Sequence, residues 1–170
     1  EYHNVIDLTI GRWLIGLKWK TDIYSGIVTS YDQNTVALQT YWYYDDPTHD
    51  VTKHTSAHIS KGNLTMQGQG SYSQRANGKF VTTQYKVDNW GNTIVVTDTR
   101  GYPTTTAYDL NLHLYPLQQC NALNQCASTQ YYGVNGVPTD TLGLPGQVKQ
   151  VLDPNGVVTA RYTYDTWGRL

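Results

Sequence analysis

One pattern recurs in the second half of the chain: a tyrosine-containing segment ends in Asp, and Gly follows three residues later. Residues 85–92 (YKVDNWGN) align with residues 162–169 (YTYDTWGR), and residues 98–101 and 153–156 carry the same Asp-x-x-Gly letters. Asp accepts backbone hydrogen bonds at the start of a β-turn, and Gly adopts the positive φ that the turn needs later. The pattern predicts hairpin turns at Asp88–Gly91, Asp98–Gly101, Asp153–Gly156 and Asp165–Gly168.

The stretches between these turns alternate in the manner of β-strands. Val81, Thr83, Tyr85 and Val87 fall on one face, and Lys86 falls on the other. This period of two predicts that one face of the sheet packs against other residues and that the other face is exposed to solvent. We therefore expect substantial burial of Tyr85, Val87, Tyr108 and Tyr162, with Lys86 and Arg161 more exposed. The residues that define the repeat are Tyr85, Asp88, Gly91, Asp98, Gly101, Tyr108, Asp109, Asp153, Gly156, Tyr162, Tyr164, Asp165 and Gly168.

Composition supports an all-β fold and excludes one class of partner. The 170 residues include 23 Thr and 15 Tyr, whereas Glu1 is the only Glu. Thr, Tyr and Val suit pleated, half-buried surfaces, and helix formers are scarce. The net charge is −1 and no run of Lys and Arg occurs, so nucleic-acid binding is not expected. No apolar stretch is long enough to span a membrane.

The last repeat is one residue longer than the one before it. Asp109 follows Asp98 by 11 residues, but Asp165 follows Asp153 by 12. A one-residue shift would move every later side chain to the opposite face, so the excess must be absorbed locally. We predict a bulge between Val157 and Tyr162, centred on Ala160. Deletion of Ala160 should leave the fold intact or make it more stable.

These motifs resemble a known repeat. Tyr-Asp-x-x-Gly and the segment Asp153–Asp165 resemble the YD repeats of bacterial RHS proteins, toxin-complex shell subunits and teneurins. His113–Pro116 and Asn121–Gln125 look like an insert found among such repeats in the toxin-complex, SpvB-like branch. The resemblance is specific from about Tyr85 to Leu170 and looser from Arg12 to Lys79. It divides the chain into an upstream β-rich segment, 1–79, and a repeat segment, 80–170, with a hairpin insert at 111–132.

The resemblance implies an antiparallel hairpin ribbon that spirals into a β-sheet shell around a toxic polypeptide. The ribbon itself performs no chemistry. A self-cleaving aspartyl segment of the RHS branch carries an Asp-Pro-x-Gly motif, and Asp153–Gly156 shares those letters. Because a further Tyr-Asp follows it within an ordinary repeat, we interpret Asp153–Gly156 as a turn. No catalytic residue and no cofactor is expected.

Two cysteines, Cys120 and Cys126, flank the five residues of a predicted hairpin loop. Cysteines on facing strands beside a tight turn can approach closely enough for a disulfide in an oxidising compartment. Free buried thiols are the alternative. A pair at this spacing without two further ligands is a poor zinc site.

The first half holds two other candidate sites. Trp13, Trp19, Trp42 and Tyr43 could form a sugar-binding face, because aromatic rings supply flat apolar area with a polar edge. Packing between strands is the alternative that their alternation favours. His54 and His58, four residues apart, are a weak candidate for a metal site, with a solvated loop as the alternative.

The sequence therefore predicts a non-catalytic structural segment of a secreted or cell-surface bacterial protein that encloses or displays a toxin or effector. The alternatives are a glycan- or partner-binding adhesin module and a self-assembling extracellular filament subunit. The expected partners are the remainder of a longer YD-repeat chain or identical copies, joined through strand edges. We predict that residues 10–19 and 157–170 pair with strands outside this chain.

Overall fold

A computed structural model describes residues 2–7, 12–25, 35–46, 48, 59–77, 79–139 and 142–170. These residues form twelve β-strands and a single helix of five residues, α1 (Tyr72–Ala76). Neighbouring strands pair antiparallel. The predicted all-β, antiparallel architecture is confirmed for this part of the chain. The one helix in the described residues is not long and apolar enough to cross a membrane.

The chain divides into two compact units. The first comprises residues 1–86 and 97–100, and the second comprises residues 87–96 and 101–170. The sequence predicts a boundary at 79/80, whereas the first unit continues through most of the strand that follows Phe80. Each unit is described by itself below.

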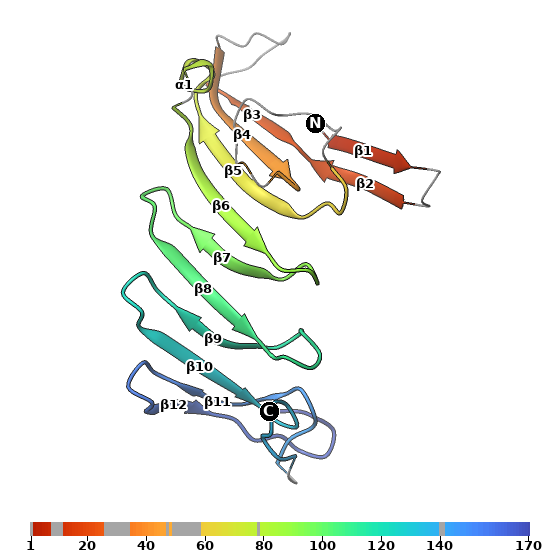
Figure 1. Cartoon of the computed structure of the whole chain (residues 1–170), viewed down its shortest axis with the longest axis vertical. Helices are drawn as coiled ribbons and strands as arrows, with labels where there is room; N and C mark the ends of the chain where they lie inside the picture. Colours follow the sequence, from red (N-terminus) through yellow and green to blue (C-terminus); the bar gives the residue numbers. More distant parts are fainter. Residues whose placement is uncertain are drawn as a thin grey trace. The chain divides into compact units, whose positions relative to one another are not determined.

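The first unit contains two antiparallel sheets. In the larger one the strand order is β3-β4-β5-β6, which is also the chain order, and the smaller one pairs β1 with β2 (Figure 1). Strand β2 pairs with β1 of its own chain along one edge. Pairing of residues 12–18 with an outside strand therefore stays a prediction for the other edge only, and Ile10 and Gly11 lie outside the described residues. The strands are β1 (Tyr2–Asp7), β2 (Arg12–Lys18), β3 (Lys20–Tyr24), β4 (Val36–Tyr44), β5 (Leu64–Gly70) and β6 (Val81–Val87).

The core of the first unit is built on one face of β4. Tyr41 and Tyr43 point to the same face and are buried together with Met66 and Phe80. Phe80 lies where β5 has two glycines instead of side chains: an ideal Cβ on Gly68 would lie 2.8 Å from Phe80 Cδ2, and one on Gly70 would lie 2.6 Å from Cδ1. The aromatic ring therefore fills the space that the glycines leave open.

The second unit is a run of strands in chain order, β7 to β12, in which each strand after β7 pairs antiparallel with the one before it (Figure 1). Because each strand crosses the sheet once, successive turns lie at alternate ends of the strands. The strands are β7 (Thr93–Thr97), β8 (Pro103–Tyr108), β9 (Pro116–Cys120), β10 (Cys126–Tyr131), β11 (Val148–Leu152) and β12 (Val158–Arg161).

Burial along the repeat is weaker than the alternation predicts. Tyr85, Val87, Tyr108 and Tyr162 are half-buried, while Lys86 and Arg161 are exposed as expected. In the described part of the second unit the buried hydrophobic side chains are Tyr132 and Val134, both in the loop between β10 and β11. The repeat tyrosines thus lie on the sheet faces, and the deepest packing lies beside that loop.

A bulge interrupts the pairing of β11 with β12, as the extra residue predicts. Val151 lies opposite Ala160, but Leu152 lies opposite Val158, so Thr159 is the residue without a cross-strand partner. The prediction of a bulge between Val157 and Tyr162 is confirmed, and its assignment to Ala160 is wrong by one position. The Thr159 hydroxyl donates a hydrogen bond to the carbonyl of Val151, at 3.2 Å, which holds the bulge in place.

Deleting Thr159 should therefore restore an unbroken ladder and leave the free energy of unfolding within about 1 kcal/mol of the parent. The control is deletion of Thr129 in β10. Thr129 lies opposite Val151 of β11, and β10 pairs with β9 along its other edge. That deletion shifts the register of an internal strand and should abolish cooperative unfolding. Urea unfolding followed by circular dichroism measures both, and equal losses would contradict the assignment of the bulge.

Candidate functional site

The repeated turns share one hydrogen-bond arrangement, shown here for Asp153. Its Oδ1 accepts the backbone N–H of Asn155 (2.9 Å) and of Val157 (2.8 Å). The Asp153 N–H donates to the Val157 carbonyl, and the Gly156 N–H donates to the Asp153 carbonyl; Gly156 has φ 79°. The same bonds recur at Asp88, with Trp90, Gly91 and Asn92, and at Asp165, with Trp167, Gly168 and Arg169.

These hydrogen bonds hold the turn carboxylates in the charged form. The backbone N–H of Val157 is the largest cause of the lowered pKa of Asp153, and that of Arg169 is the largest cause at Asp165. At Asp88 burial raises the pKa, but the hydrogen bonds from Asn92 and the turn amides outweigh it and lower the pKa. An acid held ionised by its own turn is a structural group rather than a proton donor.

The hairpin loop predicted at Asn121–Gln125 is present and closes as a fourth turn of this kind, although its residues were not matched to the Asp-x-x-Gly pattern. Asn121 Oδ1 accepts the N–H of Leu123 and of Gln125, both at 3.0 Å, and Asn124 takes the glycine position with φ 58°. Asn tolerates the left-handed region, and its amide oxygen accepts the same bonds as a carboxylate. The Asn-x-x-Asn spacing could have indicated this turn, because it has the same length as Asp-x-x-Gly with Asn in place of both Asp and Gly.

Asp109 does not form the short turn. Its carboxylate is buried and organises the longer loop between β8 and β9: Oδ2 accepts the N–H of Leu112 (2.6 Å), and Oδ1 accepts those of Leu114 and Tyr115 (2.9 Å each). Burial raises the pKa of Asp109, but these backbone bonds, with one from His113, outweigh it and lower the pKa to about 2.

The lowered pKa values predict loss of stability in acid. A carboxyl whose pKa is depressed on folding stabilises the protein fully above its unfolded pKa, near 3.9, and loses that contribution as pH falls through its folded value. For Asp109 the window runs from about pH 4 down to about 2. We expect Tm to fall steeply across this window.

Asp109→Asn should show a shallower dependence of Tm on pH across the same window, because it removes a carboxyl whose folded pKa is lowered to about 2. Its Tm at pH 7 should also be lower, since the amide group cannot accept bonds at both of its terminal atoms. Differential scanning calorimetry from pH 7 to pH 2 measures both quantities. Parallel curves for parent and variant would show that Asp109 does not supply the acid sensitivity.

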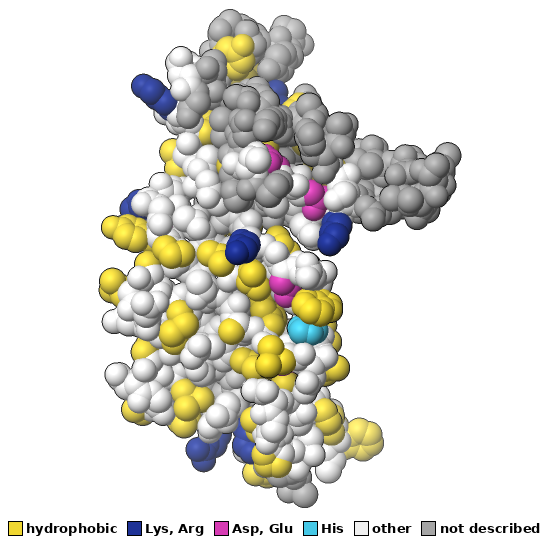
Figure 2. Space-filling model, in the orientation of Figure 1, with side chains coloured by type: hydrophobic (Ala, Val, Ile, Leu, Met, Phe, Trp, Pro, Cys, Tyr) yellow, Lys and Arg dark blue, Asp and Glu magenta, His cyan; other side chains and the backbone are white. Residues whose placement is uncertain are grey.

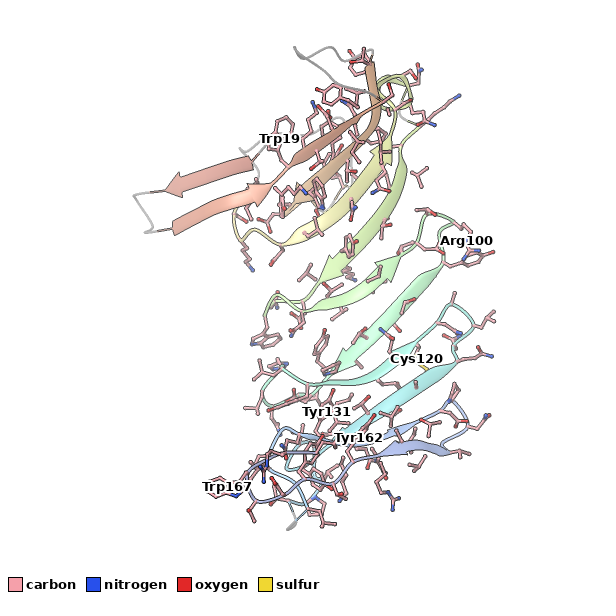
Figure 3. All side chains as sticks on the ribbon, turned by 180° about the vertical axis from the view of Figure 1, so that it is seen from behind. Trp19, Arg100, Cys120, Tyr131, Tyr162 and Trp167 are labelled. Atoms are coloured by element: carbon pink, nitrogen blue, oxygen red, sulfur yellow. A yellow bond between two sulfur atoms is a disulfide. The ribbon has the colours of Figure 1, made fainter. Side chains whose placement is uncertain are left out.

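Cys120 and Cys126 lie opposite each other on β9 and β10 and are joined by a disulfide (Figure 3). Their Cα atoms are 4.0 Å apart, and the bond closes the hairpin around the Asn121 turn. A crosslink across so short a loop stabilises by roughly 2 kcal/mol, chiefly by limiting the unfolded chain. Disulfides persist in oxidising compartments.

The candidate aromatic face is divided between core and surface. Tyr43 is buried at 3 % exposed, which leaves it no open face for a ligand. Trp19 is half-buried and meets the buried Tyr41 edge to face, with ring centroids 5.9 Å apart (Figure 3). Trp42 is half-buried beneath the Lys18 ammonium, 4.6 Å from its ring centroid. These contacts favour the packing interpretation; the side chain of Trp13 lies outside the described residues.

His54 and His58 also lie outside the described residues. In the part of the chain that the structure describes, no three His, Cys, Asp or Glu side chains gather as a metal site would require.

Two polar features of the first unit were not identified from the sequence. Asp45, with φ 54°, accepts on its carboxylate the backbone N–H groups of residues 60–63, at 2.7 to 3.0 Å, and so joins the end of β4 to the segment before β5. The nearly buried Lys20 and Asp22 form an ion pair of 2.7 Å, and the Gln39 side-chain amide donates to Asp22 at 3.2 Å. The ion pair and the Gln39 amide satisfy the nearly buried charges of Lys20 and Asp22, whereas the buried Gln39 Oε1 accepts no hydrogen bond from the described residues.

The second unit has an open pocket of about 190 Å³ between β10 and the loop that follows it. Tyr131 and Val134 give it apolar walls, and Ser128 and Asn135 add polar groups. A pocket this small holds a few ordered waters or a single side chain and is below the usual size of a ligand site. The full lining is Leu117, Ser128, Thr129, Gln130, Tyr131, Val134, Asn135 and Val137.

A scan against models of known protein families finds no match for this chain, and a search of curated proteins finds none either.

Proposed function

We propose that the chain is a non-catalytic structural segment of YD-repeat type, from a secreted or cell-surface protein, which builds a β-ribbon or shell that encloses or displays another polypeptide. The observation that carries this proposal is the recurrence of one turn, with the same hydrogen bonds at Asp88, Asn121, Asp153 and Asp165. Each turn is closed within five residues. Such a hairpin can be repeated along a chain without a new fold for each copy.

The chemistry of the turns supports a structural role. The carboxylates that the sequence brings into regular spacing accept their own backbone amides and are held ionised. The Asp153-Pro-Asn-Gly156 motif is one of these turns, with Oδ1 directed to backbone N–H groups rather than to a peptide bond to be cleaved. The disulfide of β9 and β10 supports an extracellular location.

The edge of β12 supports growth of the sheet. Tyr162 donates its N–H to the carbonyl of Lys149 in β11. Because amides on a strand point alternately to either side, the N–H of Arg161 faces away from β11. The turn at Asp165 then reverses the chain. We propose that this edge pairs with a further strand, from the rest of a longer chain or from an identical copy.

An edge-blocking variant tests the proposal. If copies of the chain pair through β12, sedimentation velocity should show concentration-dependent association. Arg161→Pro should abolish it while the chain stays folded, because proline is tolerated where the lost N–H faces outward. Ala160→Pro is the matched control: its N–H faces β11, so that variant should lose the β11–β12 hairpin itself.

Amide exchange gives the opposing outcome. A chain that remains monomeric with the Arg161 amide protected from exchange would have its edge covered by its own residues. That result would overturn the open-ribbon proposal and favour a self-contained binding module, which a glycan array would then examine.

A further inference from the structure

Two turns of the second unit carry the dipeptide Asn-Gly, at Asn135–Gly136 and at Asn155–Gly156. Both asparagines are exposed, and both glycines have a positive φ, 80° and 79°. In such a pair the Gly nitrogen can attack the side-chain carbonyl carbon of Asn, because Gly has no Cβ to hinder the approach. A third pair, 77–78, includes a residue outside the described ones. Since the two described pairs share their residues and are both exposed, a difference in their reactivity should come from their turns.

The Asn155–Gly156 pair is protected by the turn of Asp153. The Gly156 N–H donates to the Asp153 carbonyl at 3.0 Å, so the attacking nitrogen is occupied. The Asn155 side-chain amide donates to Asp153 Oδ2 at 3.4 Å, and the Asn155 N–H donates to Oδ1 at 2.9 Å. Both reacting groups must therefore leave a hydrogen bond before they can meet, which costs free energy.

The Asn135–Gly136 pair lies at the centre of a different turn. The Val137 N–H donates to the Val134 carbonyl at 3.0 Å, and positive φ at both central residues, 49° and 80°, is typical of type I′. The hydrogen bond of this turn leaves out the peptide bond between the two central residues. Among the described residues, neither the Gly136 N–H nor the Asn135 side chain has a hydrogen-bond partner.

We propose that Asn135 is a site of spontaneous deamidation. The Gly136 nitrogen gives its proton to water and attacks Asn135 Cγ, so that a C–N bond forms and the Cγ–Nδ2 bond breaks. The side-chain nitrogen takes up a proton and departs as ammonia, and a cyclic succinimide remains. One water molecule then opens the ring, at Cγ to give Asp or at the main-chain carbonyl carbon to give isoaspartate. The reaction consumes one water and releases one ammonia, and it needs no oxidant and no enzyme.

The surroundings of Asn135 give access to the water that the ring opening needs. Asn135 is exposed and lines the open pocket of about 190 Å³, together with Tyr131 and Val134. A pocket of this size with polar groups in its wall can hold ordered water. This inference is independent of the proposed structural role, since it concerns a covalent change within one loop.

The product changes the turn in two ways. Isoaspartate carries the main chain through the former side chain and adds one carbon between Val134 and Val137, whose hydrogen bond closes the turn. Val134 is buried, so its packing depends on that closure. Either product also adds a carboxylate to a chain whose net charge is −1. Because the face of the second unit shown in Figure 2 has few charged side chains, anion exchange should separate the modified form.

Incubation of the full chain at mildly alkaline pH, followed by proteolysis and mass spectrometry, measures the conversion of both pairs in one sample. Asn135 should convert at least about fivefold faster than Asn155, the factor expected where one pair must first break a hydrogen bond. Asn155 is thus an internal control. In concentrated urea the two rates should become similar, because the turns that distinguish the pairs are then lost. Asn135→Gln should remove most of the acidic form, since Gln would have to close a larger ring.

Asp153→Ala tests the physical reason for the difference. This variant loses the carboxylate that binds the Asn155 side chain and its N–H, so the conversion of Asn155 should rise several-fold while that of Asn135 stays unchanged. Equal rates at the two pairs in the folded chain would overturn the proposal, and so would faster conversion of Asn155. A difference that persists in urea would come from the neighbouring residues rather than from the turns and would equally contradict it.

Discussion

Replacing Tyr132 by Ala is expected to lower the free energy of unfolding by about 3 to 5 kcal/mol, because removal of a buried aromatic ring loses its transfer energy and leaves a cavity. Tyr132 is 1 % exposed. Its hydroxyl donates to the carbonyl of Tyr162 at 3.1 Å, and its ring meets Tyr164 edge to face. It therefore joins the loop after β10 to the segment that follows β12.

The surroundings of Tyr132 leave little room for the cavity to collapse. The ring lies directly against Gly143, and the Lys149 ammonium lies 4.9 Å from its centroid. Gly143 has no side chain to fill the space, and the Lys149 side chain ends in an ammonium that is costly to bury in an apolar cavity. We therefore expect the loss to fall toward the upper end of the range.

Tyr102→Ala is the matched control, since it removes the same side chain from a position that is 57 % exposed in the same unit. Its effect should stay within about 0.5 kcal/mol. Guanidinium unfolding followed by circular dichroism measures both variants. Similar losses for the two would mean that the loop between β10 and β11 contributes no core.

Replacing Phe80 by Ala is expected to cost a similar 3 to 5 kcal/mol, roughly, in the first unit. Phe80 is buried among Tyr41, Tyr43 and Met66, with the Tyr41 ring centroid 5.6 Å from its own. The glycines of β5 that it covers have no side chains to fill the cavity. Val81→Ala, at a neighbouring position that is 53 % exposed, should have a much smaller effect.

A double-mutant cycle examines the contact between Phe80 and β5. Gly68→Ala should destabilise the parent, because its new Cβ would meet the Phe80 ring at 2.8 Å. In the Phe80→Ala background the same methyl enters the vacated space and should be neutral or stabilising. The coupling between the two changes should therefore exceed about 0.5 kcal/mol. Additive effects would show that the ring and the glycine act independently.

Local features were readable from the residues themselves. The turns at Asp88, Asp98, Asp153 and Asp165 occur where the Asp and Gly spacing predicts them, because a β-turn is closed within a few residues and depends little on its surroundings. The bulge was predictable for a related reason: a surplus of one residue must be absorbed somewhere in the hairpin. Whether Thr159 or Ala160 absorbed it depended on how β12 lies against β11.

The same sequence motif forms different structures where hydrogen bonds from more distant residues take part. Tyr108-Asp109 resembles the other Tyr-Asp pairs, yet its carboxylate is buried under a longer loop because Leu112, Leu114 and Tyr115 bring their amides to it. Asn121 shows the converse, since it forms the common turn without the common residues. In each case the hydrogen-bond geometry, and not the residue name, defines the turn.

The all-β class follows from the residues alone, because alternating Thr, Tyr and Val between Asp and Gly turns favour antiparallel strands and both the strand period and the turn chemistry are local. Which aromatic rings are buried depends instead on contacts between distant segments. Tyr41 and Tyr43 lie in a core, whereas Trp90 and Trp167, at equal positions of two equal turns, lie in solvent. The alternation of side chains along a strand gives the sheet two faces, but the packing of other segments decides which face is buried.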